Sequence, residues 1–219
     1  GDLGAEYTDD LLRKFQLTPD QMFEILDYTQ ACGLVPLCTP WEKTSLARLD
    51  EYGVVGFKIS SADMTNHSLL AAAADTGKPI IISTGMSFEY EIKDSVDILR
   101  SKGVDFSLLH CNSTYPAPFQ DVNLSYLTRL KEISSGTVGY SSHERGFEVC
   151  LAAVAMGAKI IEKHFTVDRT MEGNDHRVSL LPDEFAKMVA AIRNVEDAIG
   201  LNKTRQPTQG ERMNREVLA

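Results

Sequence analysis

The feature that most constrains the fold of this 219-residue chain is a strand–helix unit that recurs six times. In each unit an apolar run ends in small polar residues, and an amphipathic stretch follows that usually stops at a glycine. Strands that alternate with helices pair in parallel through right-handed crossovers, so the pattern predicts an α/β fold. The predicted strands cover residues 34–39, 54–60, 79–84, 106–111, 137–142 and 159–165. The helix of each unit follows its strand, at residues 41–52, 66–76, 88–102, 123–134, 145–156 and 181–199.

The segments that flank the six units differ from them in pattern. Residues 1–18 are polar and show no sustained period, which predicts an irregular lead-in. Thr18 and Pro19 then suit the N-cap and the first turn of a helix that stops at Gly33. Residues 201–219 are polar and rich in charge, and we expect them to form a linker that leads towards a further domain.

The composition disfavours two classes of partner. The net charge of −9 argues against nucleic acid, because phosphate backbones are bound by basic surfaces. No apolar run reaches the ~20 residues that cross a bilayer, and the N-terminus lacks a signal-peptide pattern, so we expect no membrane contact. The four cysteines show no CxxC spacing. Buried free thiols are therefore the favoured interpretation, and they fit a cytoplasmic location.

Two architectures accommodate six such units: a doubly wound sheet and most of an eight-unit barrel. A doubly wound sheet would concentrate its site near one switch point, usually with a glycine-rich loop, and neither GxGxxG nor GxxxxGKS/T occurs. Polar residues instead follow all six strands. Because the loops of a barrel converge on one mouth, this distribution favours a (β/α)8 TIM barrel.

The strand ends supply the candidate site residues. Side chains two positions apart share one face of a strand, so Ser141 lies beside His143, and Glu162 beside His164. Two histidines on adjacent strands could hold a divalent metal. Lys163 points the opposite way, and we expect it to face the helices. The full set is Thr39, Lys58, Ser60, Ser61, Asp63, Ser83, Thr84, Asn112, Ser113, Tyr115, Ser141, Ser142, His143, Glu162, Lys163 and His164.

Lys58 lies in an otherwise apolar strand, where an unpaired ammonium would cost several kcal/mol. It should therefore meet an anion from the protein or from a ligand, and the hydroxyls around it would suit a phosphate or a carboxylate. Structural roles stay open for other groups. Serines and threonines at strand ends are often helix caps, and His67 and His110 fit structural positions better than a metal site.

Five segments carry a resemblance to a known family. They are Phe57–Asp63, Pro79–Met86, Leu108–Pro116, Val138–His143 and Ile161–Thr166, in matching order and at matching separations. Through them the chain resembles the sialic acid synthases over most of its length. The resemblance implies a (β/α)8 TIM barrel over residues 19–200. It also implies a reaction that joins phosphoenolpyruvate to the open-chain aldehyde of an N-acetylated amino sugar such as N-acetylmannosamine, giving phosphate and a 2-keto nine-carbon sugar acid.

The same resemblance implies roles for individual residues. His143 and His164 would bind a divalent metal, Mn²⁺ or Mg²⁺, which would polarise the aldehyde oxygen as a Lewis acid. Asp63 and Asp175 match residues around the sugar and the attacking water, and with Lys58 they are the expected catalytic residues. Positions that hold phosphoenolpyruvate match Thr39, Lys58, Ser61, Ser83, Ser113, Tyr115 and Ser141. A homodimer is expected as well.

Three departures from the family pattern matter. Ser142 stands where many relatives carry Asp beside the metal histidine, and Ser113 stands where some carry Asn. The first two strands of the barrel, which carry an acidic residue and a lysine of the site, are expected to be missing, because residues 1–18 are too short for two units of about 30 residues each. Two alternatives stay open: a synthase for legionaminic, pseudaminic or spore-coat sugar acids, or an incomplete chain that only binds metal or phosphoenolpyruvate.

Overall fold

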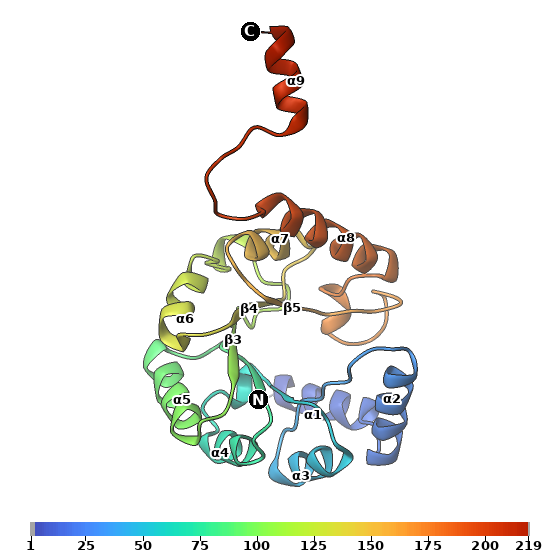
Figure 1. Ribbon diagram of the computed structural model, residues 1–219. Helices are drawn as coiled ribbons and strands as arrows, with labels where there is room; N and C mark the ends of the chain where they lie inside the picture. Colours follow the sequence, from blue (N-terminus) through green and yellow to red (C-terminus); the bar gives the residue numbers. More distant parts are fainter. Residues whose placement is uncertain (1–2, 219) are drawn as a thin grey trace.

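A computed structural model describes residues 3–218 as a parallel sheet surrounded by helices (Figure 1). The strands lie in sequence order, each paired in parallel with the next, as successive strand–helix units require. They are β1 (Phe57–Ile59), β2 (Ile80–Ser83), β3 (Phe106–Cys111), β4 (Val138–Ser142) and β5 (Ile160–Lys163). Because all of them run in the same direction, their carboxyl ends meet at one edge of the sheet.

Local sequence sets the ends of several helices. Helix α2 begins with a capping box, in which the Gln21 N–H donates to Thr18 Oγ1 and the Thr18 N–H donates to Gln21 Oε1. Helix α3 ends at Gly53, whose φ of 92° suits a residue without a Cβ. The α-helices are α1 (Leu3–Phe15), α2 (Pro19–Ala31), α3 (Lys43–Tyr52), α4 (His67–Asp75), α5 (Glu89–Lys102), α6 (Tyr126–Ser134), α7 (Glu148–Ala155), α8 (Pro182–Ile199) and α9 (Gln209–Leu218). Short 3₁₀ turns lie at Ser61–Asp63, Phe119–Asp121 and Asp175–Arg177.

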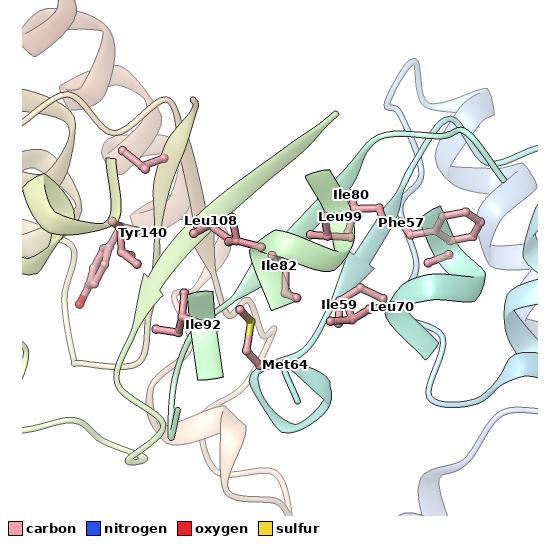
Figure 2. Close-up of a cluster of buried hydrophobic side chains, with 14 of the residues drawn as sticks. Phe57, Ile59, Met64, Leu70, Ile80, Ile82, Ile92, Leu99, Leu108 and Tyr140 are labelled. Atoms are coloured by element: carbon pink, nitrogen blue, oxygen red, sulfur yellow. The ribbon is translucent and has the colours of Figure 1, made fainter. Parts of the chain in front are cut away.

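The outer face of the sheet, which packs under the helices, holds the apolar core. Figure 2 shows Phe57 and Ile59 of β1 and Ile82 of β2 gathered with side chains of the covering helices, such as Leu70 and Leu99. All five are fully buried. The alternate positions of the same strands form the inner face of the sheet, and polar groups gather at its carboxyl-terminal end.

The sheet is strongly curled. Strands β1 and β5 are its two edges, yet the Lys58 ammonium of β1 lies 3.5 Å from Glu162 Oε2 of β5. Such an approach requires the inner face to be concave, so that side chains from both edges meet across it. The architecture is therefore a parallel α/β fold with a curled, five-stranded sheet, and it agrees with the barrel class predicted from the strand ends.

The first of the six predicted strands is wrong. Residues 34–39 contribute only Cys38, which forms an isolated parallel bridge with Phe57. Leu34 and Val35 are 65% and 67% exposed, so the apolar run has no covering layer in this structure, and Pro36 has no N–H to donate to a ladder. The apolar pattern was present, but the packing partners that make a strand were not.

Both flanking segments contain helices that the sequence pattern did not predict. The lead-in expected to be irregular forms α1, which an Asp9–Arg13 pair at i, i+4 supports with a 2.7 Å hydrogen bond. The predicted linker contains α9, which stands apart from the other helices in Figure 1. Thr208 and Glu211 cap its start, since the Thr208 N–H donates to Glu211 Oε2 at 2.7 Å. Among the described helices, none has the length and apolar character needed to span a membrane.

Candidate active site

Side chains on the inner face form one hydrogen-bonded chain at the carboxyl ends of the strands. The Lys58 ammonium donates to Ser83 Oγ at 2.8 Å and to the Ile59 carbonyl at 2.9 Å. Its other neighbour is Glu162, whose Oε1 accepts from Ser141 Oγ at 2.7 Å. Strands β1, β2, β4 and β5 thus each deliver one polar side chain to the same place. We call these four side chains (Lys58, Ser83, Ser141 and Glu162) the lysine cluster.

The charge on Lys58 is balanced within the protein. Its side chain is only 12% exposed, and burial lowers its pKa, although the Glu162 carboxylate offsets part of that shift. The expectation that Lys58 meets an anion is confirmed, and the anion is a protein carboxylate. Glu162 itself is 38% exposed, so its carboxylate remains accessible to solvent or to a ligand.

His143 is held in a defined orientation directly after β4. Its Nδ1 lies 2.6 Å from the Asn112 carbonyl oxygen, which can only accept, so Nδ1 carries the proton. Nε2 then accepts from the Tyr115 hydroxyl at 3.0 Å, and the two rings stack with centroids 4.1 Å apart. Burial lowers the pKa of His143, but the Cys111 thiol and the Asn112 carbonyl raise it, and the net shift is upward.

His164 completes the pair from the end of β5. Its ring centroid lies 5.1 Å from that of His143, with the rings at 70° to each other. Nδ1 is 3.8 Å from Asp175 Oδ2, which is too long for a hydrogen bond but close enough for electrostatic attraction. Burial is the main cause of the lowered pKa of His164. The Tyr115 ring stands edge-on to it at 5.6 Å.

The two imidazoles fit a divalent metal. A metal-binding histidine usually donates its second ring N–H to a carbonyl or carboxylate, and the Nδ1–H of His143 does so to Asn112. Nε2, which here meets the Tyr115 hydroxyl, is then the nitrogen that would bind the metal. Within residues 3–218 no group of three or more His, Cys, Asp or Glu side chains assembles around one point. Any remaining ligands would come from substrate or water, as in catalytic metal sites that keep open positions.

A buried thiol that the sequence did not single out lies beside the histidine pair. Cys111 Sγ is 3.7 Å from His143 Nδ1 and 3.9 Å from Ser113 Oγ. Ser61 Oγ accepts the Gly85 N–H at 3.0 Å, and a Cβ at Gly85 would collide with both Ser61 and Ser113. Glycine at this position therefore lets three strand ends approach closely. All four cysteines are free, as predicted, but the predicted burial holds only for Cys111 and Cys150, since Cys38 is half-buried and Cys32 is exposed.

Three other predicted residues lie outside the lysine cluster. Asp175 is two-thirds exposed and approaches His164, as described above. Asp63 is buried, with Asn66 Nδ2 donating to one carboxylate oxygen and Ser60 Oγ to the other. Thr39 lines a cavity of about 520 Å³ against α2 and α3, whose lining includes none of the lysine cluster or the histidines. Thr39 thus lies apart from the lysine cluster and the histidine pair, and the hydrogen-bond partners of the Asp63 carboxylate are Ser60 and Asn66 rather than members of either group.

Lys163 faces outward as predicted. Its ammonium donates to Ser142 Oγ at 2.7 Å and to the backbone carbonyl of Glu144. These contacts lie on the outer face, under α7, while the neighbouring Glu162 and His164 face inward. The alternation of side chains along β5 therefore places Lys163 on the outer face and its neighbours Glu162 and His164 on the inner face.

Comparison with known proteins gives a consistent set of relatives. The model of the NeuB family matches residues 2–204. The N,N'-diacetyllegionaminic acid synthase of Campylobacter jejuni is 40% identical over 193 residues, which are 87% of this chain and 58% of that protein. The N-acetylneuraminate-9-phosphate synthase of Mus musculus is 35% identical over 189 residues, which are 86% of this chain and 53% of that protein. The chain thus spans a little over half the length of these relatives.

A solved structure supports the same relationship. The N-acetylneuraminic acid synthetase of Leptospira borgpetersenii, crystallised with citrate, superposes with a TM-score of 0.90 at 36% identity. The match covers 99% of this chain and 75% of that one. The curled parallel sheet and its helices are therefore an arrangement that this solved protein shares.

Proposed function

Because the chain belongs to the NeuB family, the family of the sialic acid synthases, we propose that its protein joins phosphoenolpyruvate to an N-acetylated amino sugar. The products would be a 2-keto nine-carbon sugar acid and phosphate. The observation that carries the proposal is the convergence of the lysine cluster and the histidine pair at one end of the curled sheet. In the whole protein, we propose, this sheet belongs to a (β/α)8 barrel.

The lysine cluster is suited to the anionic groups of phosphoenolpyruvate. Lys58 supplies the positive charge; the Ser83 hydroxyl accepts directly from its ammonium, and the Ser141 hydroxyl donates to its partner Glu162. Ser61 and Ser113 add two more hydroxyls beside Gly85. A ring of donors around one ammonium matches a phosphate or carboxylate, whose oxygens accept several hydrogen bonds at once. The ligand would take over part of the contact that Lys58 now makes with Glu162.

His143 and His164 would hold the divalent metal, Mn²⁺ or Mg²⁺, and once bound it would supply Lewis-acid polarisation of the sugar aldehyde. Tyr115 stacks on one ring and stands edge-on to the other, so it keeps both imidazoles in place. Glu162 faces the same space and would balance part of the added positive charge. In the reaction, C3 of phosphoenolpyruvate forms a bond to the aldehyde carbon, water adds at C2, and the C2–O bond to phosphate breaks. Asp175, exposed beside His164, is the group we propose to take the proton from that water.

Phosphate release tests the proposed reaction. We would incubate the protein with phosphoenolpyruvate and Mn²⁺, together with N-acetylmannosamine, its 6-phosphate, or a diacetamido sugar of the legionaminic or pseudaminic type. Release that depends on both sugar and metal supports the proposal, and the preferred sugar identifies the acceptor. No release with any sugar would contradict it.

A second candidate is binding without turnover. It is favoured by the margin of the site, where Thr39 lies apart from the cluster and Asp63 is held by Ser60 and Asn66. Calorimetry separates the two. Phosphoenolpyruvate that binds in the presence of Mn²⁺ while no sugar yields phosphate indicates a binding chain, whereas binding with turnover indicates the synthase.

A further inference from the structure

A second polar cluster, on the outer face of β4 and β5, has no part in the proposed reaction. It consists of Tyr140, Ser142, Glu144 and Lys163, which we call the outer cluster. Glu144 Oε2 accepts from the Tyr140 hydroxyl, and its Oε1 accepts from Ser142 Oγ, both at 2.7 Å. The Lys163 ammonium donates to the same Ser142 Oγ and to the Glu144 backbone carbonyl. Lys163, Ser142 and the Glu144 carboxylate thus form one continuous hydrogen-bonded chain.

The depth of this cluster is unusual for charged groups. Glu144 and Ser142 are 0% exposed and Tyr140 is 1% exposed, beneath α7. An ionised carboxylate is costly to bury, and a buried polar network adds little net stability over apolar residues of the same size. Such a network is well suited to fixing one conformation, because each member has its hydrogen bonds only when the backbone follows one path.

The backbone segments that this network fixes are those that carry the two histidines. His143 is the residue between Ser142 and Glu144, and both of these point outward and are hydrogen-bonded to each other. His143 must therefore point inward, where its ring meets Asn112 and Tyr115. Lys163 likewise directly precedes His164. One buried chain of hydrogen bonds therefore ties together the two strand ends that present the imidazoles.

We propose that Glu144 is a positioning residue for His143 and His164, and that it acts through the buried hydrogen bonds of its carboxylate. An Asp at 142 would face Lys163 directly. Here Ser142 occupies that place and relays the Lys163 ammonium to a carboxylate two residues further along the same face. The inference rests on the proposed function, because its main readout is the affinity of the metal site. Its test also includes a readout that does not depend on metal binding.

The experiment compares the wild-type chain with Glu144→Gln and with the double variant Ser142→Asp/Glu144→Ser, which moves the carboxylate to position 142. For each, the Kd for Mn²⁺ is measured by electron paramagnetic resonance and the melting temperature by calorimetry. Glu144→Gln should weaken Mn²⁺ binding about tenfold, the scale seen when groups behind metal ligands are changed. The double variant should restore an affinity close to that of the wild type. Glu51→Gln, the same change at an exposed position of α3, should leave the affinity unchanged.

Two results would overturn the inference: a folded Glu144→Gln chain with wild-type Mn²⁺ affinity, or a double variant that binds no better than Glu144→Gln. If Glu144→Gln does not fold, the double variant alone tests the inference. It must then both fold and bind Mn²⁺ for the inference to hold. If the wild-type chain binds no Mn²⁺, the proposed metal role fails, and nitrogen NMR of the His143 ring decides instead. The ring should keep its Nδ1–H tautomer in the wild type and double variant and lose that single state in Glu144→Gln; an unchanged tautomer would contradict the positioning role.

Discussion

The inner and outer faces of β4 and β5 carry similar side chains and use them differently. On the outer face, the Glu144 carboxylate is fully buried and accepts hydrogen bonds from two hydroxyls, while Lys163 donates to two acceptors. On the inner face, the Glu162 side chain is 38% exposed. His164 is 26% exposed, and its charged neighbour Asp175 stands at 3.8 Å. The outer groups have their hydrogen bonds filled by protein partners, whereas the inner groups stay accessible to solvent and can accept or donate further hydrogen bonds.

The difference shows how one strand can serve both stability and binding. Alternation sends adjacent charged residues to opposite faces, and what covers each face then sets its role. Beneath α7 the charged groups can only pair with one another. At the open, concave face they can pair with a ligand. Changes on the outer face should therefore lower the free energy of unfolding, and changes on the inner face should lower ligand affinity.

The largest effect on stability is expected for Lys163→Met. Removing the ammonium leaves the buried Glu144 carboxylate without its counter-charge, and the free energy of unfolding should fall by about 3 kcal/mol. Urea denaturation measures the change. The double variant Lys163→Met/Glu144→Gln should recover part of the loss, because no charge is then buried alone. A loss below about 1 kcal/mol for the single variant would mean that the outer cluster is not a saturated structural network.

Lys58→Met makes the matching change on the inner face. Phosphoenolpyruvate should bind about 30-fold more weakly, since a hydrogen bond to a charged group contributes about 2 kcal/mol. The free energy of unfolding should change by less than about 1 kcal/mol, because the Glu162 carboxylate is already partly solvated. Calorimetry and urea denaturation give the two values. Lys159→Met, an exposed control at the residue directly before β5, should alter neither. A large stability loss with unchanged affinity for Lys58→Met would reverse the assignment of the two faces.

A pH titration of binding sharpens the inner-face assignment. Burial lowers the pKa of Lys58 below its ordinary value. The ammonium that we propose to attract phosphoenolpyruvate is present below that pKa and lost above it. Affinity should therefore weaken as the pH rises through a point below the usual lysine range. Lys58→Arg should bind with less loss over the same range, because a guanidinium stays charged. An affinity that holds constant up to the ordinary lysine pKa would remove Lys58 from the anion site.

Much of the fold follows from patterns that a single chain contains. The apolar runs of β1 to β5 are long enough to be found, and the glycines at Gly53 and Gly103 mark where helices end. The run at 34–39 has the same pattern, but strand formation depends on a covering layer, which a pattern does not reveal. Helix α1 was missed for a different reason: Leu3, Tyr7, Leu11 and Phe15 do recur at helical spacing, but the segment has no glycine stop of the kind that marks the ends of α3 and α5.

The candidate site was predictable where chemistry follows from position along a strand. The inward pairing of Glu162 and His164, and the need of Lys58 for an anion, follow from the two-residue alternation and from the cost of a buried charge. Contacts between strands were not predictable, and so the place of Cys111 against His143 was missed. The outward position of Glu144 could have been predicted, since the alternation that turns His143 inward also turns its neighbours on both sides outward.

We propose that the inner face binds a metal between its two imidazoles, and Mn²⁺ binding tests that proposal most directly. Electron paramagnetic resonance of free Mn²⁺, titrated with the chain, should show one bound ion per chain. His143→Ala and His164→Ala should each abolish that binding while the melting temperature stays close to that of the wild type. A wild-type chain that leaves all the Mn²⁺ free, or a histidine variant that binds it as tightly as the wild type, would contradict the claim.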